Sequence, residues 1–240
     1  MILRTFQESR PTLYSAQTSP GNGKVCGVCG TSVLAQYRNG VPDEQQWKAA
    51  FDHLLSETDY PLIALQPTNL LPTCKFCNSD AKLAKDVLHN ARKERRLSFD
   101  PWKESAFGLV QMGIDFHATG PAATITFVPN NPVVAEKMET WNAVYDIKQR
   151  VLGEFSSLGL KISDDLDLDS LTDLRLSLFK QQRKRLACMR VSPYNYWRAL
   201  LYAGMRALRD DELDQVRQLF QEVYASELAD CDAIFGDLLA

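Results

Sequence analysis

The sequence predicts an α+β protein in two parts, and three observations support this prediction. Four of the six cysteines fall into two Cys-x-x-Cys pairs within the first third of the chain. The prolines between these pairs forbid a long helix there and favour loops and short strands. Beyond about residue 130, apolar residues recur at helical spacing. We therefore expect one domain over residues 1–98 and a second over residues 99–240.

The composition is that of an ordinary folded protein without a membrane span. Hydrophobic residues make up 45% of the chain and charged residues 24%, which is typical of soluble globular proteins. No apolar run approaches the roughly 18 residues of a membrane helix. Met1–Pro20 also lacks the apolar core of a signal peptide. The sequence thus predicts a cytoplasmic protein with no membrane contact.

The charge is unevenly distributed along the chain. Residues 1–98 carry a net charge of +3 and residues 99–240 one of −6, which together give the total of −3. A negative total argues against a protein that coats nucleic acid by bulk electrostatics. Between Cys74 and Arg96, however, seven basic residues face three acidic ones. We expect contact with phosphate in that segment, and a protein partner for the acidic remainder.

The second part is expected to be a small hairpin followed by a mainly helical domain. Leu109–Phe116 and Thr124–Val128 have the pattern of two strands joined by a turn. A further helix is expected in the first part, after the second cysteine pair, over Asn78–Arg96. The expected helices of the second part are Val133–Phe155, Leu171–Met189, Tyr194–Leu208 and Asp211–Leu228.

The paired cysteines predict a structural zinc site. Cys26, Cys29, Cys74 and Cys77 supply four thiolates, the number that a tetrahedral Zn²⁺ ion requires. Without an export signal, the cysteines are not expected to form disulfides. The alternatives are four unrelated buried cysteines or a redox dithiol, but neither pair lies in the βαβ pattern of redox dithiols. The two remaining cysteines, Cys188 and Cys231, are expected to be buried reduced thiols.

Further motifs lie between and beside the cysteine pairs. The chain reads Phe51-Asp52-His53-Leu54, then Asn69-Leu70-Leu71-Pro72, and the second pair runs directly into Asn78. This order, with a lysine at position 82, resembles the HNH endonuclease family. The resemblance covers about a quarter of the chain and implies a zinc-stapled ββα-metal fold. It also implies metal-dependent hydrolysis of DNA that leaves 5′-phosphate and 3′-hydroxyl ends.

The chemistry of these residues agrees with that resemblance. The ordinary pKa of histidine, about 6.5, suits His53 to take a proton from water as the general base. Asp52 and Asn78 offer hard oxygen atoms that could hold one Mg²⁺ or Mn²⁺ ion. Asn69 is expected in a structural role, bonding backbone in the loop between two strands. Because neighbours on a strand point to opposite faces, the strand must end or bend at Asp52 and His53.

The basic segment after the second cysteine pair is the expected DNA contact. We expect it to bind phosphates without reading bases, although a solvated helix face is the alternative. The residues expected to bind DNA are Lys75, Lys82 and Lys85, with Arg92, Lys93, Arg95 and Arg96 beside them.

A narrower resemblance rests on the run from Phe51-Asp52-His53 through Tyr60-Pro61, with Pro67-Thr68-Asn69-Leu70 and Pro72-Thr73-Cys74. These segments are similar to the HNH subunits of Septu-type and retron-type anti-phage defence systems. That resemblance implies a partner ATPase of the SMC-like or ABC type, docked on the helical second part. Two other interpretations remain. One is a non-catalytic zinc-knuckle module that binds DNA or protein, and the other is a scaffold with an inactive HNH site.

Overall fold

The structure is a computed structural model in which two compact units can be described. The described residues are 24–36, 38–42, 45–156, 158, 162 and 165–239, and the side chains of the last helix are described as far as residue 226. Met1–Pro20, where no export signal is expected, lies outside these residues. Unit 1 comprises residues 1–110, 127–150 and 187–196, and unit 2 comprises residues 111–126, 151–186 and 197–240. This division differs from the expected one at residue 98.

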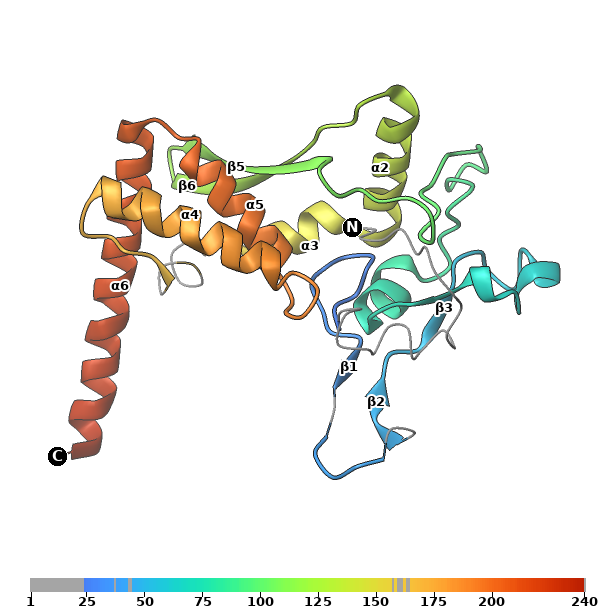
Figure 1. Cartoon of the computed structure of the whole chain (residues 1–240), viewed down its shortest axis with the longest axis horizontal. Helices are drawn as coiled ribbons and strands as arrows, with labels where there is room; N and C mark the ends of the chain where they lie inside the picture. The colour runs from blue at the N-terminus through green and yellow to red at the C-terminus, as the bar shows by residue number, and fades with distance from the viewer. Residues whose placement is uncertain are drawn as a thin grey trace. The chain divides into compact units, whose positions relative to one another are not determined.

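Apart from helix α2, unit 1 is built from short elements (Figure 1). Its strands pair antiparallel as β1 with β2 and β3 with β4, and each strand has only two or three residues. Such ladders supply few backbone hydrogen bonds, so other contacts must hold the unit. In chain order it contains β1 (Ala35–Gln36), β2 (Trp47–Lys48), β3 (Phe51–His53), the 3-10 turns η2 (Pro61–Ile63) and η3 (Pro67–Asn69), β4 (Leu70–Pro72), the π-helix η4 (Phe76–Lys82) and α2 (Pro132–Tyr145).

Helix α2 belongs to the same unit as the cysteines. The buried Trp141 donates a hydrogen bond from Nε1 to the carbonyl oxygen of Val28, 3.0 Å away. At the other end of the helix, the Asn131 side chain accepts from the backbone of Val134 and caps the first turn. The helix stops because Asp146 is left-handed, with φ 51°. The expected single helix Val133–Phe155 is therefore wrong at this residue, and α3 (Ile147–Glu154) follows as a separate helix.

The helix after the second cysteine pair is also shorter than expected. It ends at Lys82, and Leu83 has a positive φ of 49°. Further on, the Asp86 carboxylate accepts from the backbone N–H of Leu88 at 2.8 Å, a local bond that competes with helix formation. Residues 88–96 then form a tight hairpin with an antiparallel bridge between positions 89 and 95. The prediction of helix over Asn78–Arg96 is wrong beyond Lys82.

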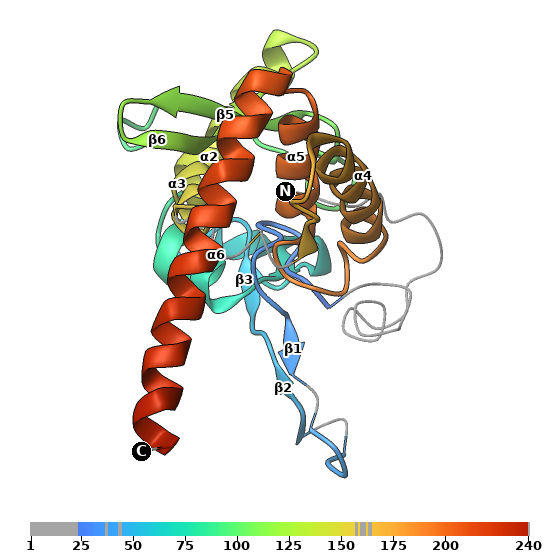
Figure 2. The same ribbon diagram turned by 90° about the vertical axis from the view of Figure 1, so that its left-hand side faces the viewer.

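Unit 2 combines a hairpin with several helices (Figure 2). The predicted hairpin is confirmed as β5 (Val110–His117) and β6 (Gly120–Phe127), and Gly120, the first residue after the turn, has a φ of +113°. A Cβ at Gly204 would lie 2.2 Å from the carbonyl oxygen of Met112, so only glycine permits this approach. Fully buried side chains include Leu174, Leu178, Trp197, Leu201, Tyr202 and Phe220. The helices are α4 (Leu171–Ala187), α5 (Asn195–Arg206) and α6 (Asp210–Leu239), after the last residues of α3.

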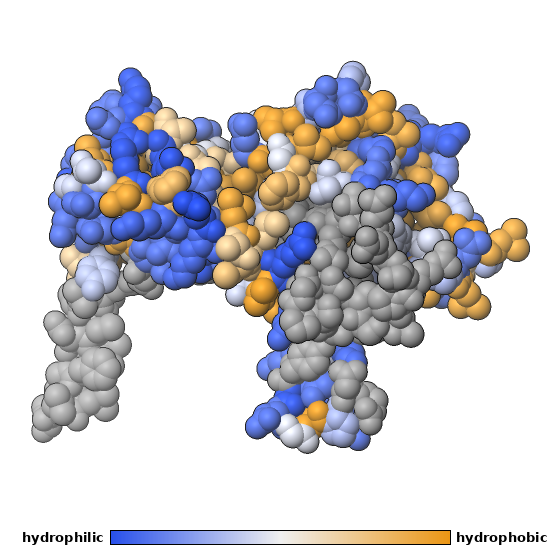
Figure 3. Space-filling model, in the orientation of Figure 1, coloured by the Kyte–Doolittle hydropathy of each residue, from blue (hydrophilic) through white to orange (hydrophobic). Residues whose placement is uncertain are grey.

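The α+β class is thus confirmed, with small sheets and several helices. The face of α4 seen in Figure 3 is largely hydrophilic. Cys188, expected to be buried, is exposed one residue beyond α4, so that prediction is wrong. The side chain of Cys231 lies outside the described residues.

Candidate functional site

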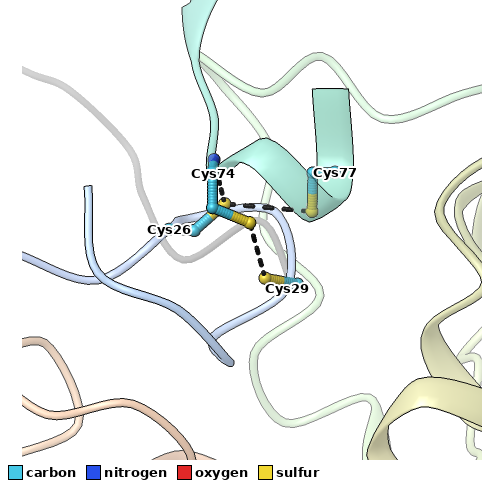
Figure 4. Close-up of side chains that lie close together, drawn as sticks. All are labelled: Cys26, Cys29, Cys74 and Cys77. Atoms are coloured by element: carbon cyan, nitrogen blue, oxygen red, sulfur yellow. Dashed lines mark hydrogen bonds between the residues drawn. The ribbon is translucent and has the colours of Figure 1, made fainter. Parts of the chain in front are cut away.

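The four cysteines of the two pairs converge on one point (Figure 4). All four are buried, and their sulfur atoms lie within 4.8 Å of one another. The Sγ atoms of Cys26 and Cys77 are 4.0 Å apart and those of Cys29 and Cys74 are 3.7 Å apart. Four sulfurs bound about 2.3 Å from a Zn²⁺ ion lie about 3.8 Å from one another in a regular tetrahedron. The cluster can therefore hold one zinc ion, as the spacing predicted.

Each pair lies in a tight turn that its own backbone closes. In the first, the N–H of Gly30 donates to the carbonyl of Cys26 at 2.8 Å, and Gly30 has a φ of 69°. In the second, the N–H groups of Cys77 and Asn78 both donate to the carbonyl of Cys74 at 3.0 Å. These bonds aim both sulfurs of a pair at the same point. They also fix Asn78 directly beside the cluster.

Hydrogen-bond donors surround the sulfur atoms. The backbone N–H and the hydroxyl of Thr31 donate to Cys29 Sγ at 3.4 and 3.1 Å. Arg150, from α3, donates to Cys77 Sγ at 3.4 Å. Burial alone would lower the pKa of Arg150, but the adjacent Cys77 sulfur raises it overall. Donors of this kind stabilise thiolate ligands. Sequence reasoning missed Arg150, because it lies 73 positions from Cys77 and no local pattern marks it.

His53 is the last residue of β3, where it faces Leu70 of β4. Its side chain is 31% exposed, and Nε2 lies 4.0 Å from a carboxylate oxygen of Glu57. The strand ends at the Asp52–His53 pair, as the sequence required. The two side chains nevertheless differ, since Asp52 is buried and His53 is half-buried. The imidazole is the only part of this pair that solvent can reach readily.

Asp52 forms a buried ion pair with Lys82. The Nζ atom of Lys82 lies 2.8 Å from Asp52 Oδ1 and donates at 2.7 Å to the carbonyl oxygen of His53. Lys82 is only 4% exposed. Its ammonium group is not available to a phosphate on the surface, so the structure does not support the expected DNA contact by this residue. Instead, Lys82 ties the end of η4 to the strand that carries Asp52 and His53.

Asn69 has the structural role that the sequence predicted. Its side-chain oxygen accepts from the N–H of Leu55 at 2.7 Å, and its side-chain nitrogen donates to the carbonyl of the same residue at 3.0 Å. The backbone carbonyl of Asn69 also accepts from Leu54 at 2.8 Å. The asparagine is buried and extends the β3–β4 pairing beyond His53.

The other predicted site residues differ in their exposure to solvent. Asn78 is half-buried, and its side chain makes no hydrogen bond within the described residues. Lys75 is exposed. Lys85 is exposed but donates to the carbonyls of Ala143 and Val144 at 3.3 Å, at the C-terminal end of α2, where a cation is favourable.

The donors expected to hold a divalent ion have suitable chemistry. Asp52 Oδ2 is buried and has no hydrogen-bond partner within the described residues, and such an atom is costly unless some group satisfies it. Asn78 offers a second hard oxygen. Burial raises the pKa of Asp52, and the charge of Lys82 only partly opposes this shift. Oxygen atoms of this kind are the ligands that Mg²⁺ and Mn²⁺ prefer, and the other carboxylate oxygen of Asp52 already accepts from Lys82.

A second polar cluster lies in unit 1 outside the predicted site. Tyr60 donates from its hydroxyl to Asp86 Oδ2 at 2.7 Å, and Nδ1 of His89 lies 2.9 Å from the same oxygen. Burial of the hydroxyl and its bond to Asp86 raise the pKa of Tyr60 to about 12. No sequence pattern marks His89 as part of a cluster, because its partners are a loop residue, Tyr60, and the carboxylate of Asp86 in a turn.

The chain matches no family model, no curated protein and no solved structure. Within the described residues, none of the helices combines the length and apolar character that crossing a membrane requires.

Proposed function

We propose that this chain is a metal-dependent HNH-type DNA endonuclease in which His53 is the general base. The observation that carries the proposal is the Lys82 ammonium group, which contacts both Asp52 and the carbonyl of His53. This contact joins the helix that begins beside the cysteine cluster to the strand pair of the Asp-His motif. A strand pair, a helix and a cysteine cluster in one small unit support the ββα-metal interpretation.

The proposed chemistry assigns one role to each residue. His53, half-exposed at the end of its strand, takes a proton from the attacking water. The water oxygen bonds to phosphorus, the bond to the 3′ oxygen breaks, and that oxygen gains a proton from solvent. Asp52 and Asn78 would hold the divalent ion, which supplies positive charge against the phosphate when bound. Zinc in the cysteine cluster would have a structural role, fixing Asn78 through Cys77.

The proposal is tested with His53→Ala in a plasmid-cleavage assay containing Mg²⁺. We expect the rate to fall by about 10²–10⁴-fold, the usual contribution of a general base, with unchanged zinc content and melting temperature. The matched control is His117→Ala, since His117 is an exposed histidine of β5 with no assigned role. Full cleavage by a folded His53→Ala protein would reject the mechanism.

A non-catalytic zinc-knuckle module that binds DNA or protein is the second candidate. Burial of Asp52 against Lys82 favours it, because the Asp52 side chain is almost fully buried and its Oδ1 atom already accepts from Lys82. The same assay separates the two candidates. DNA binding without cleavage, in protein that contains zinc and is supplied with Mg²⁺ and Mn²⁺, would select the module.

We also propose a role in anti-phage defence beside an ATPase partner, which the resemblance implies. Support comes from the acidic second part, with a net charge of −6 over residues 99–240. Two leucines of the β3–β4 loop, Leu62 and Leu65, are 95% and 86% exposed, and a partner could cover their apolar surface. Repeating the cleavage assay with and without the product of a neighbouring ATPase gene tests this role.

A further inference from the structure

Residues 90–95, here called the basic turn, form a closed loop held by its own hydrogen bonds. The side-chain oxygen of Asn90 accepts from the N–H groups of Arg92 and Glu94 at 2.9 and 3.0 Å. The N–H of Lys93 donates to the carbonyl of Asn90 at 2.9 Å, and Lys93 has a φ of 62°. These bonds fix the backbone, so the exposed basic side chains project from a defined base. They are Arg92, Lys93 and Arg95.

The positive charge of the basic turn has no counterpart within the described residues. None of its three cations forms an ion pair there. The single acid of the turn, Glu94, instead accepts from the side-chain nitrogen of Asn90 at 2.6 Å. The turn therefore keeps a net charge of +2 on the surface of a chain whose total is −3. Fixed surface charge of this kind attracts a polyanion.

The base of the turn is tied to the loop that follows His53. An antiparallel bridge joins His89 to Arg95, which closes the hairpin. His89 and Tyr60 share the carboxylate of Asp86, at 2.9 and 2.7 Å. Tyr60 lies in the loop between β3 and β4, which begins after His53. The basic turn is thus anchored, through His89, Asp86 and Tyr60, to the loop that begins after the proposed catalytic His53.

We propose that the basic turn binds the phosphate backbone of duplex DNA and sets the position of that backbone relative to His53. The inference rests on the proposed nuclease function and names its substrate contact. The turn holds cations but no aromatic side chain, so it offers phosphate contacts and no platform for stacking unpaired bases. Contacts of this kind position a duplex without reading its sequence.

The test measures binding rather than cleavage. Full-length His53→Ala protein is titrated with a labelled duplex of about 20 base pairs, without added divalent metal, between about 50 and 200 mM salt. Adding Arg92→Gln, Lys93→Gln and Arg95→Gln should weaken binding by about tenfold or more at the lowest salt. It should also reduce the slope of log K against log salt by about 0.9 for each lost phosphate contact, up to about 2.7. The side chains are exposed, so the melting temperature should not change.

The matched control removes the same charge from an exposed helix face, with Lys180→Gln, Arg183→Gln and Lys184→Gln in α4. An unchanged slope in the basic-turn variant, or an equal loss in the α4 control, would overturn the proposal. So would tighter, turn-dependent binding of single-stranded DNA. If the parent with His53 never cleaves but its binding depends on the turn, the nuclease proposal fails and the turn proposal stands. If the parent cleaves DNA but its binding does not depend on the turn, the turn proposal fails and the nuclease proposal stands.

Discussion

Unit 1 and unit 2 differ in the interactions that stabilise their folds. In unit 2, long helices bury large side chains such as Trp197, Tyr202 and Phe220 completely. In unit 1, the named strands have two or three residues, and individual polar groups replace missing ladder bonds. Asn69 continues a strand pair, Lys82 joins a helix to a strand, and four cysteines join two loops.

This difference affects how each unit should respond to damage. Apolar burial contributes roughly in proportion to area, so many side chains share the stabilisation of unit 2. A metal cluster or a buried ion pair concentrates the stabilisation in a few atoms. Unit 1 should therefore be sensitive to loss of a single ligand or charge that would leave unit 2 folded. Both proposed functional features, His53 and the basic turn, belong to unit 1.

Removal of zinc is the largest expected effect. Structural zinc in small domains binds with an apparent free energy of about 10–16 kcal/mol, which matches or exceeds the whole stability of a typical domain. A chelator, or Cys77→Ser, should therefore unfold unit 1. Hydrogen exchange should show lost protection in peptides from residues 45–100 and retained protection in peptides from residues 197–226.

Cys188→Ser is the control, because this cysteine is exposed and lies outside the cluster. It should leave both zinc content and exchange unchanged. An equal loss of exchange protection in both units after chelation would contradict the proposed difference between them. Active protein that contains no zinc after purification in reducing buffer would also contradict it.

The buried ion pair gives the next largest effect. Lys82→Met leaves the Asp52 carboxylate buried without its cation, which typically costs about 3–5 kcal/mol. Asp52→Asn in the same chain should recover part of the loss, since it removes the unpaired charge. Lys75→Met, at an exposed position of the same segment, should change the free energy of unfolding by less than about 0.5 kcal/mol. Urea unfolding of the four proteins measures these values, and equal losses for Lys82→Met and Lys75→Met would contradict the assigned role.

Much of the structure was predictable where the signal is local. Each Cys-x-x-Cys pair is visible within four residues of sequence, so the cluster of four cysteines was predicted correctly. The hairpin β5–β6 and the start of α5 were placed within a few residues, because alternation and helical spacing are visible in short windows. Asn69 was predicted to bond backbone, and it does so with Leu55.

The rest depended on contacts between distant positions. The sequence shows that Lys82 is charged but not that it is buried, because the burial arises from Asp52, 30 positions away. Arg150 reaches the cysteine cluster only because α2 ends at a left-handed Asp146 and the chain begins a new helix. Helix formers after Asn78 suggested a long helix, but local hydrogen bonding by Asp86 gave a turn.

The smallest predicted effect concerns the pH dependence of the cluster around Asp86. Burial alone would raise the pKa of this carboxyl, but hydrogen bonds from the Leu88 backbone, Tyr60 and His89 hold it below its ordinary value of 3.8. A carboxyl whose pKa is lower in the folded state stabilises that state above its ordinary pKa, and the contribution is lost as the pH falls through the folded value. The nearby Arg96, which donates to the Asp86 backbone carbonyl, stays charged throughout this range.

Asp86→Asn should therefore lower the free energy of unfolding by about 1.5–3 kcal/mol near neutral pH, the value of hydrogen bonds to a charged group. The difference from the parent should shrink as the pH falls below 3.8. Asp80→Asn, an exposed acid of η4, is the control and should show almost no difference at either pH. Urea unfolding near neutral pH and below pH 3.8 measures these free energies of unfolding. A deficit that is constant with pH would mean that Asp86 acts through the shape of its side chain, and the basic turn would then be anchored by neutral hydrogen bonds instead of by charge.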